Sequence, residues 1–367
     1  MAGAGATQVP WEAVGRLGVG LLAAIILAST VWGLTPASGD ASRATARARA
    51  ADAYAAMQRY FYSPADDSYT GVYPKRGHAQ AWPFSQALWA TLRAAPDDLR
   101  ARLAELTAYS HPEPGRPAEF APRYGGSGVV YNDDNLWIAL ALEQLGDPAS
   151  TRTAAQLFDL VTDGWDADAM HPCPGGVFWT RLGANRDRNT VTTANVALLA
   201  LDLFGRSKKN AYLTFASRAY DWTKRCLGRQ DGLIADHIDL KGRVDWTTWS
   251  YNQGAMIAAA VGLYRATGER RYLMDAQRIA SAALKAFRDP LRSGEPPFFL
   301  AIFYRDLRKL DAVAPRRAYK AAEEAFADAA WAQARDPRTG LFRFGGRQPT
   351  LLDQAAMVQI YAELAGS

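Results

Sequence analysis

Apolar positions along this chain recur mostly at helical spacing, and hardly any stretch alternates polar and apolar residues as a surface strand would. From residue 43 onward the helical stretches are of two kinds. In the first kind, charged residues line one face and apolar residues the other, which predicts a helix with one face in water. In the second kind charge is nearly absent, which predicts a helix buried on all sides. The pattern therefore predicts an all-α fold.

The two kinds of stretch alternate strictly. The amphipathic stretches, expected to form outer helices, cover residues 44–61, 97–108, 148–161, 208–227, 270–288 and 315–335. The nearly uncharged stretches, expected to form inner helices, cover residues 83–95, 133–145, 192–204, 251–264, 298–307 and 350–364. Six helical hairpins in this order predict an (α/α)6 toroid, in which inner helices cannot accommodate charge. An open α-solenoid would give a similar alternation, although its usual regular period is missing.

The predicted toroid determines where a binding site would lie. Because an outer helix separates each inner helix from the next, all inner helices run in the same direction and their N-termini meet at one end. The segments that lead into these helices contain aromatic, amide and acidic residues. Aromatic faces stack on sugar rings, while amides and carboxylates bond sugar hydroxyls. We therefore expect a carbohydrate cleft at this end. Helix starts can also bind phosphate, but the sequence has no glycine-rich phosphate loop.

Two adjacent carboxylates, Asp133 and Asp134, lie between Asn132 and Asn135 at the start of one apolar stretch. The structural interpretation is that they cap the helix, since Asp and Asn are favoured there. The chemical interpretation is a general acid and nucleophile pair, because two carboxylates in one pocket repel and one can hold a proton. A helix start allows both interpretations, since adjacent residues there can face one cleft.

The N-terminal part of the chain predicts export. Residues 17–34 carry no charge and follow Arg16, and the small residues Ala37-Ser38-Gly39 have the form of a cleavage site. The length of this stretch lies between a signal-peptide core and a membrane span. Residues 1–42 are therefore predicted to be a signal peptide or membrane anchor with a short linker, and residues 43–367 a single catalytic domain. The domain would be secreted or tethered, with the membrane contacted only through this segment.

Composition and charge narrow the partners. The chain has 367 residues, 49% of them hydrophobic, and a net charge of +5, but no basic run interleaved with aromatics, so we expect no nucleic-acid partner. Cys173 and Cys226 are the only cysteines, and an exported pair can form a disulfide, although the sequence does not establish that they meet. Four scattered histidines offer no repeated ligand spacing, so no metal or other cofactor is predicted.

Four sequence blocks, taken together, resemble glycoside hydrolase family 76, the endo-α-1,6-mannanases and related mannan-processing enzymes. The resemblance extends from about residue 53 to the C-terminus. The blocks are Tyr131-Asn132-Asp133-Asp134, Pro174-Gly175-Gly176-Val177-Phe178-Trp179, Asp231-Gly232-Leu233-Ile234-Ala235-Asp236 and Thr247-Thr248-Trp249-Ser250-Tyr251-Asn252-Gln253-Gly254.

The resemblance implies a retaining glycoside hydrolase with Asp133 as nucleophile and Asp134 as general acid/base. The sequence itself does not establish which aspartate has which role. Further residues, chosen because they lie in these blocks or at inner-helix starts, are candidates for substrate binding: Asn132, Trp179, Asn195, Asp236, Trp249, Tyr251, Asn252 and Gln253.

Each of these candidates has a structural alternative. The tryptophans, Trp246 among them, could equally pack in the core, and Asp236 could cap a turn beside Gly232. The charged segment at residues 186–188 is interpreted as a solvated loop.

The expected activity is cleavage of α-1,6-linked mannan in a cell-envelope polymer. A transglycosylase would use the same carboxylates to pass the glycosyl group to an acceptor sugar. A non-catalytic mannan-binding protein would bind the polymer and release no product. The oligomeric state is left open.

Overall fold

The computed structural model describes residues 37–74, 77–111, 119–181 and 185–366. The chain divides into two units, Met1–Ser38 and Gly39–Ser367, and the second unit contains nearly all of the described residues. The predicted export segment at residues 17–34 lies outside the described residues. None of the helices in the described ranges combines the length and the apolar character needed to cross a membrane.

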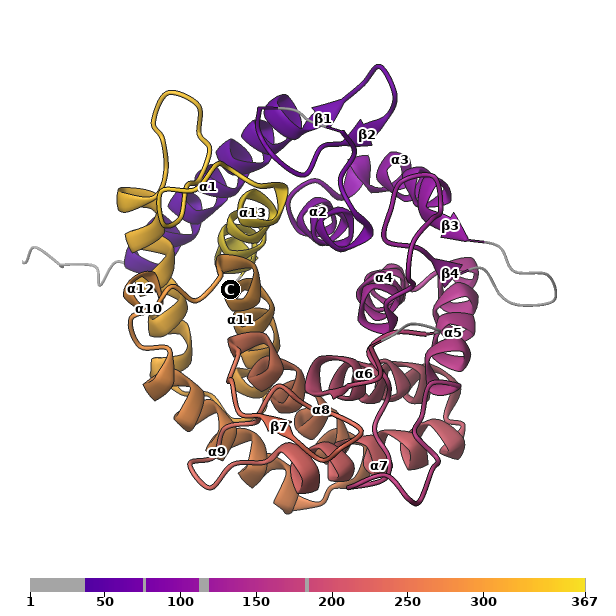
Figure 1. Ribbon diagram of the computed structural model, residues 1–367. Coiled ribbons are helices and arrows are strands. Elements are labelled where there is room, and N and C mark those ends of the chain that lie inside the picture. The colour runs from indigo at the N-terminus through magenta and orange to yellow at the C-terminus, as the bar shows by residue number, and fades with distance from the viewer. Residues whose placement is uncertain (1–36, 75–76, 112–118, 182–184, 367) are drawn as a thin grey trace, which may run out of the picture. The chain divides into compact units, whose positions relative to one another are not determined.

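Six helices form a closed inner ring (Figure 1). They are α2 (Ala81–Ala94), α4 (Asn132–Leu145), α6 (Thr190–Ser207), α8 (Ser250–Thr267), α11 (Pro297–Asp311) and α13 (Leu351–Gly366). Each packs against the next, and α13 packs against α2, where Gln359 Nε2 donates to the Gln86 carbonyl at 3.2 Å. The unit is therefore a closed helical barrel, and an open solenoid is excluded.

The outer helices enclose this ring (Figure 1). They are α1 (Ala37–Phe61), α3 (Leu99–Ala104), α5 (Pro148–Thr162), α7 (Asn210–Leu227), α9 (Arg270–Ala286) and α12 (Arg317–Gln333), with a short extra helix α10 (Pro290–Ser293). The predicted outer helix at residues 97–108 is wrong as one continuous helix. It consists of α3 between two 3-10 helices, η1 (Pro96–Asp98) and η2 (Glu105–Tyr109). A segment this short depends on tertiary contacts, here the hydrogen bond that Arg102 donates to the Tyr62 hydroxyl at 2.7 Å.

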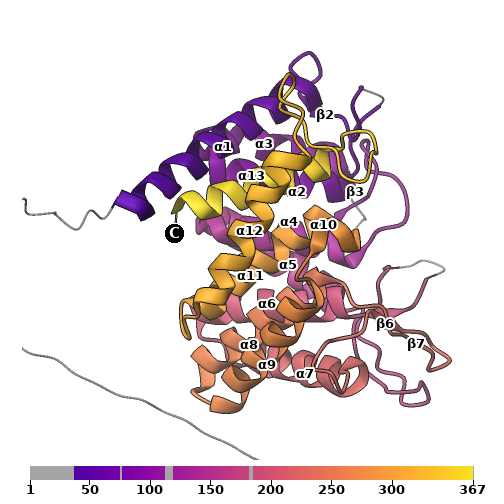
Figure 2. The same ribbon diagram turned by 90° about the vertical axis from the view of Figure 1, so that its left-hand side faces the viewer.

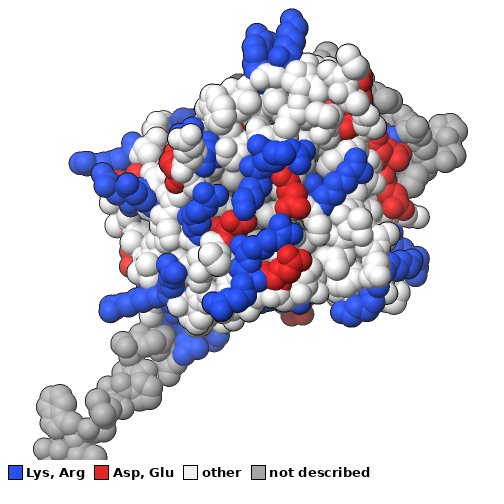
Figure 3. Space-filling model, turned by 90° about the horizontal axis from the view of Figure 1, so that it is seen from below, with Lys and Arg blue, Asp and Glu red and all other residues white. Residues whose placement is uncertain are grey.

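The wet faces of the outer helices carry mixed charge. Figure 3 shows basic and acidic side chains intermingled on the side of the barrel seen from below. Lys224 of α7 pairs with Asp275 of α9, and Arg271 of α9 lies 3.8 Å from Asp221 of α7. These pairs join neighbouring outer helices across their exposed edges.

The inner helices bury charged side chains, whereas the sequence analysis expected these helices to exclude charge. Glu143 is buried at the end of α4 and is bonded by Arg206 of α6. Arg305 of α11 is buried with its guanidinium 4.0 Å from the Trp89 ring centre and 4.0 Å from Asp306. The oppositely charged neighbours of Glu143 and Arg305 reduce the cost of burying these two groups.

Long loops and small sheets gather at one end of the barrel (Figure 2). β1 (Tyr62–Ser63) pairs with β2 (Ser68–Tyr69), and β3 (Ser110–His111) pairs with β4 (Glu119–Phe120). A third sheet contains β5 (Arg188–Asn189), β6 (His237–Ile238) and β7 (Val244–Asp245), all antiparallel. Cys173 in a loop and Cys226 of α7 form a disulfide, with Cα atoms 6.2 Å apart. The two cysteines whose pairing the sequence left open therefore meet.

Candidate active site

A cleft of about 280 Å³ opens where four inner helices begin. The starts of α2, α4, α8 and α11 contribute to its walls, together with two loop residues. Its lining residues are Gln80, Trp82, Pro122, Tyr131, Asp133, Asp134, Trp137, Trp179, Tyr251 and Phe299. The expected convergence of inner-helix starts is thus present for these four helices.

The start of α4 directs its two aspartates and its two asparagines differently. Asn135 accepts a hydrogen bond from the Phe120 amide at 2.8 Å and donates one to the Phe120 carbonyl at 3.0 Å. Asn132 donates to the Phe178 carbonyl at 2.8 Å. The asparagines thus hold two loops against the helix, while Asp133 and Asp134 line the cleft.

The capping interpretation of the aspartates is wrong in detail. The N-cap residue of α4 is Tyr131, and no side chain makes a capping hydrogen bond there. Asp133 and Asp134 instead occupy the first turn. The positive end of the helix dipole still favours their ionised forms, but the side chains remain available to the cleft.

Asp133 is held by the indole of Trp179, whose Nε1 donates to its Oδ1 at 3.0 Å. The pKa of Asp133 is raised to about 6, mainly by burial and in smaller part by the negative charge of Asp236. The Trp179 hydrogen bond and nearby backbone N–H groups lower this pKa in part, because they stabilise the carboxylate. The Asp133 carboxylate is therefore ionised at neutral pH and fixed in direction.

Asp134 is 8% exposed and has no hydrogen-bond partner among the residues that the structure describes. Burial raises its pKa well above the usual range, and the neighbouring charge of Asp133 raises it further. Two carboxylates share one desolvated pocket, so ionisation of the first opposes ionisation of the second. Of the two carboxyl groups, Asp134 is therefore the one that its surroundings favour in the protonated form.

Aromatic rings form the walls around the pair. Tyr251 and Phe299 stack with ring centroids 4.0 Å apart and planes 10° apart. Trp82 lies 5.5 Å from Trp137 on another wall. Flat apolar surfaces beside two carboxylates suit a sugar ring, whose C–H face stacks while its hydroxyls bond to acids.

The other predicted binding residues fall into two groups. Trp179 and Tyr251 line the cleft with the aspartates. Several others do not line it: Asn132, Asn195, Trp249, Asn252 and Gln253. Three of these bond to neighbouring segments instead, namely Asn132, Asn252 and Gln253. Gln253, for example, accepts from the Ile234 amide at 2.9 Å and donates to its carbonyl at 2.9 Å. Asn195 is fully buried.

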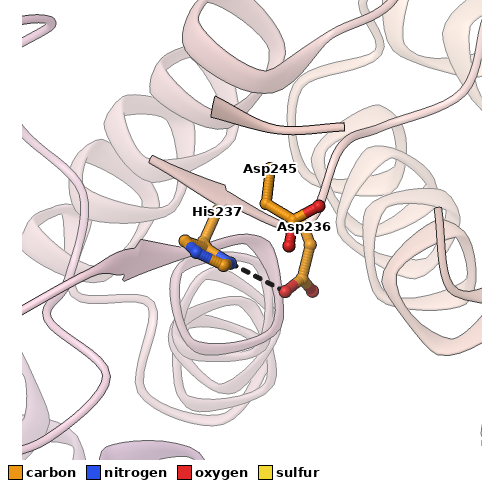
Figure 4. Close-up of side chains that lie close together, drawn as sticks. All are labelled: Asp236, His237 and Asp245. Carbon is orange, nitrogen blue, oxygen red and sulfur yellow. Dashed lines mark hydrogen bonds and ion pairs between the residues drawn. The ribbon is translucent and has the colours of Figure 1, made fainter. Parts of the chain in front are cut away.

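Asp236 is not among the residues that line this cleft, but it lies near enough to Asp133 for its charge to raise the pKa of that carboxyl. Its Oδ1 accepts from Asn252 Nδ2 at 2.9 Å, and its Oδ2 contacts His237 Nδ1 at 2.9 Å (Figure 4). Asp236, His237 and Asp245 also bring potential ligand atoms within 4.8 Å of one another, the spacing a metal ion would need. The His237 ring is already engaged by Asp236 as an imidazole–carboxylate pair, so we assign no metal to this cluster.

Some cleft residues were missed in the sequence. Phe299 and Trp137 fall within the stretches 298–307 and 133–145, which the sequence predicted only to be buried helices. Glu295 does not line the cleft, but its carboxylate accepts from the Ser250 amide at 2.7 Å and so caps α8; it too gave no local signal. The place of these residues in the site depends on how separate helices pack together. The spacing of residues along one segment does not reveal that packing.

The solvated-loop interpretation of residues 186–188 is wrong for Arg188. This side chain is fully buried and pairs with Asp166 at 2.7 Å. It also donates to the Asp239 carbonyl at 2.8 Å. Arg188 thus joins two of the loops that surround the cleft.

A closed helical barrel with a carboxylate pair in an aromatic cleft defines the class of barrel proteins built to bind and cut glycans. Residues 45–345 match the model of glycosyl hydrolase family 76, and the chain belongs to this family. The resemblance carried by the four sequence blocks is thereby confirmed.

Several known proteins are similar to this chain. The mannan endo-1,6-alpha-mannosidase DCW1 of Saccharomyces cerevisiae is 24% identical over 152 residues, which cover 39% of this chain and 33% of that protein. The chain spans less than half the length of the curated relatives it matches.

Solved structures share the fold over most of the chain. A family 76 glycoside hydrolase (mannosidase) from Bacteroides thetaiotaomicron superposes with a TM-score of 0.76 at 21% identity, covering 88% of this chain and 98% of that one. An inactive variant of an alpha-1,6-mannanase from Salegentibacter, with two consecutive aspartates changed to asparagine, is in complex with alpha-1,6-mannotriose. It superposes with a TM-score of 0.71 at 18% identity, covering 87% of this chain and 99% of that one.

Proposed function

We propose that this protein is a retaining glycoside hydrolase that cleaves α-1,6-mannosidic linkages in mannan with Asp133 and Asp134. The observation that carries the proposal is the adjacent carboxylate pair in the aromatic cleft. One member is held by Trp179, and the other is buried without a hydrogen-bond partner in the described chain, in surroundings that raise its pKa well above the usual range.

The chemistry follows from these two environments. Asp134 donates its proton to the glycosidic oxygen, and the leaving sugar departs as an alcohol. Asp133 attacks the anomeric carbon and forms a covalent glycosyl-enzyme. Asp134, now ionised, takes a proton from water, and the resulting hydroxide displaces Asp133. Two inversions retain the anomeric configuration, and each residue returns to its starting state.

The choice of substrate is supported by similar proteins. The yeast relative is named for endo-1,6-α-mannosidase activity, and the Salegentibacter protein is named an alpha-1,6-mannanase. The latter's inactive variant carries asparagine at two consecutive aspartate positions. Asp133 and Asp134 are consecutive in this chain and lie in its cleft.

Export to the cell envelope is part of the proposal. The uncharged stretch at residues 17–34 supports it from the sequence, and the Cys173–Cys226 disulfide supports an oxidising compartment. The polymer cut there would be a mannan outside the cytoplasm. A fusion to a reporter active only after export tests this directly, and deletion of residues 17–34 should retain the reporter inside the cell.

Incubation with linear α-1,6-mannan, followed by NMR of the newly formed anomeric proton, tests the activity. We expect oligosaccharides whose first-formed anomer is α. Asp133→Asn and Asp134→Asn should each lower the rate by at least ~10³-fold, in view of typical losses on removing a catalytic group. Asp147→Asn, which changes a capping carboxylate on α5, is the matched control and should keep the rate.

Two results would contradict the proposal. Binding of mannan without release of products indicates a mannan-binding protein. A β anomer formed first indicates an inverting reaction. An added acceptor sugar that diverts most of the product into longer chains identifies a transglycosylase with the same carboxylates.

A further inference from the structure

His237 occupies the middle of the small sheet beside the cleft. In the register of this sheet, His237 of β6 is paired with Asn189 of β5 on one side and Asp245 of β7 on the other. Figure 4 shows its imidazole directed at the carboxylate of Asp236, with the Asp245 carboxylate nearby. The sheet therefore places one imidazole among carboxylates from several segments.

Three carboxylates face His237, and in the described part of the chain no Lys or Arg pairs with them. Nδ1 lies 2.9 Å from Asp236 Oδ2, and Nε2 lies 3.6 Å from Asp187 Oδ2. The third carboxylate is Asp245. The hydrogen bond to Asp236 raises the pKa of His237, and the charges of Asp236, Asp187 and Asp245 raise it further. The imidazolium form is thus the one that this pocket stabilises.

Asp236 is clamped from both sides. His237 binds Oδ2, and the Asn252 amide binds Oδ1 at 2.9 Å. Asn252 is fully buried on inner helix α8, so it provides a rigid support. His237 is the one of the two clamps whose strength depends on protonation, since a neutral imidazole loses its charge attraction to the carboxylate.

Asp236 acts on the nucleophile through its charge. Its carboxylate raises the pKa of Asp133. Because His237 carries a compensating positive charge next to Asp236, protonation of His237 reduces the negative field at Asp133. The protonation state of His237 therefore affects the reacting carboxylate of Asp133 through the charge of Asp236.

We propose that His237 is a positioning residue that, in its protonated form, holds Asp236 in place and offsets its charge beside Asp133, where the mannosyl unit is seated. This inference rests on the proposed function. Loss of the His237 proton at higher pH loosens Asp236 and leaves its charge uncompensated beside the bound sugar. Substrate binding then weakens.

The test measures KM and kcat for a mannan oligosaccharide across pH for the wild type, His237→Ala and His237→Gln. We expect the wild-type KM to rise severalfold as pH passes from 6 to 9. His237→Ala should have a KM about tenfold higher at pH 6 and flat across this range, with kcat within about threefold. His237→Gln keeps a neutral donor, so its KM should be intermediate and equally flat.

His171→Gln is the matched control. His171 Nδ1 also contacts a buried carboxylate, Asp166, at 2.9 Å, but it lies in a different loop. Its substitution should leave the wild-type dependence of KM on pH unchanged. A His237→Ala enzyme that keeps the wild-type dependence of KM on pH overturns the inference, as does a loss confined to kcat.

Two further measurements separate this inference from the proposed function. The first is NMR titration of the His237 ring, which requires no turnover. Asp236→Asn should lower the His237 pKa by at least one unit. An unchanged pKa overturns the inference even if mannan is cleaved. Chelation with EDTA should leave KM unchanged. A loss of binding restored by Ca²⁺ or Zn²⁺ would show that a cation, not a proton, holds these carboxylates, and would also overturn it.

Discussion

Asp134 has the environment least favourable to a charge in the cleft. Its carboxyl is 8% exposed and has no partner in the described chain, whereas Asp133 is bonded by Trp179. The difference supports the proposed roles of Asp134 as acid and Asp133 as nucleophile. It agrees with the order that family resemblance implies, although burial and resemblance are independent of each other.

The pH dependence of kcat/KM should report this pair. Protonation of Asp133 removes the nucleophile, so kcat/KM should fall tenfold per unit as pH drops below about 6. Loss of the Asp134 proton removes the acid, so kcat/KM should also fall at a higher pH. Initial rates at low substrate concentration between pH 4 and 10 measure both limbs. A profile flat down to pH 4 would contradict the raised pKa of Asp133.

Asp134→Asn should stabilise the protein at neutral pH. A carboxyl whose folded pKa is raised favours the unfolded state once pH exceeds its unfolded pKa, near 3.8. The stability cost is absent below that pH, grows as pH rises toward the folded pKa and is constant above it. Removing the ionisable group should therefore raise Tm at pH 7.5 by about 2 °C or more, equivalent to ~1 kcal/mol.

Thermal unfolding at pH 7.5 and pH 4 checks this expectation. The gain in Tm should shrink at pH 4, because this pH is close to the unfolded pKa of 3.8 and the unfolded chain gains little by ionising Asp134 there. Asp147→Asn is the control of opposite sign, since hydrogen bonds from Ser150 lower the pKa of Asp147, and its loss should not stabilise. A lower Tm for Asp134→Asn at pH 7.5 would mean that the ionised carboxylate is stabilised in the fold.

At the scale of elements, the alternation of wet and dry helices was enough to predict the barrel. The uncharged stretch at residues 251–264 corresponds to α8 (Ser250–Thr267), and the amphipathic one at residues 270–288 to α9 (Arg270–Ala286). Loops were predicted less well. Arg188 was expected in solvent because three charged residues in a row usually are, and its buried partner Asp166 lies 22 positions away.

The same limit applies to the candidate site. The aspartate pair was identifiable because its two members are adjacent in one segment. Phe299 and Glu295 were not, because each contacts the start of α8, which precedes it by more than 40 residues. Asn195 and Gln253 occupy inner-helix starts as expected, yet the cleft is lined without them. A helix start can point a side chain at the cleft or at the next helix, and local sequence does not distinguish these.

The loop that carries Trp179 offers an element-level prediction. Gly176 has φ of +78°, and a Cβ there would lie 2.4 Å from the Trp222 ring. Gly176→Ala should therefore force the loop away from α7 and displace Trp179 from Asp133. We expect a loss of ~2–4 kcal/mol in the free energy of unfolding and a drop in kcat of at least tenfold.

Gly345→Ala is the matched control for this loop. Gly345 also has a positive φ, +60°, but a Cβ there meets nothing within 4 Å. The substitution carries the backbone strain without the steric clash, so it should cost ~1 kcal/mol and leave kcat unchanged. Denaturant unfolding and initial rates compare the two variants. Equal effects would show that backbone strain alone, and not the contact with Trp222, accounts for the loss.

For the whole barrel unit, closure makes every helix depend on the ring. α13 packs against α2 and α11, and its Gln354 donates to the Ala53 carbonyl of α1 at 2.9 Å. Arg93 of α2 pairs with Glu363 of α13 at 2.8 Å. Removal of α13 would expose apolar faces on three helices at once. A repeat array open at its ends would lose only one neighbour on such a deletion.

Two truncations distinguish these behaviours. A chain that begins at Gly39 keeps the whole second unit and should unfold within about 2 °C of the full chain. A chain that ends at Thr350 lacks α13 and should show no cooperative thermal transition by calorimetry, because the closed ring is one cooperative unit. A cooperative transition in the second protein, at a Tm lowered by only a few degrees, would mean that the hairpins stabilise one another only pairwise. Ring closure would then contribute little to holding the helix starts that form the cleft.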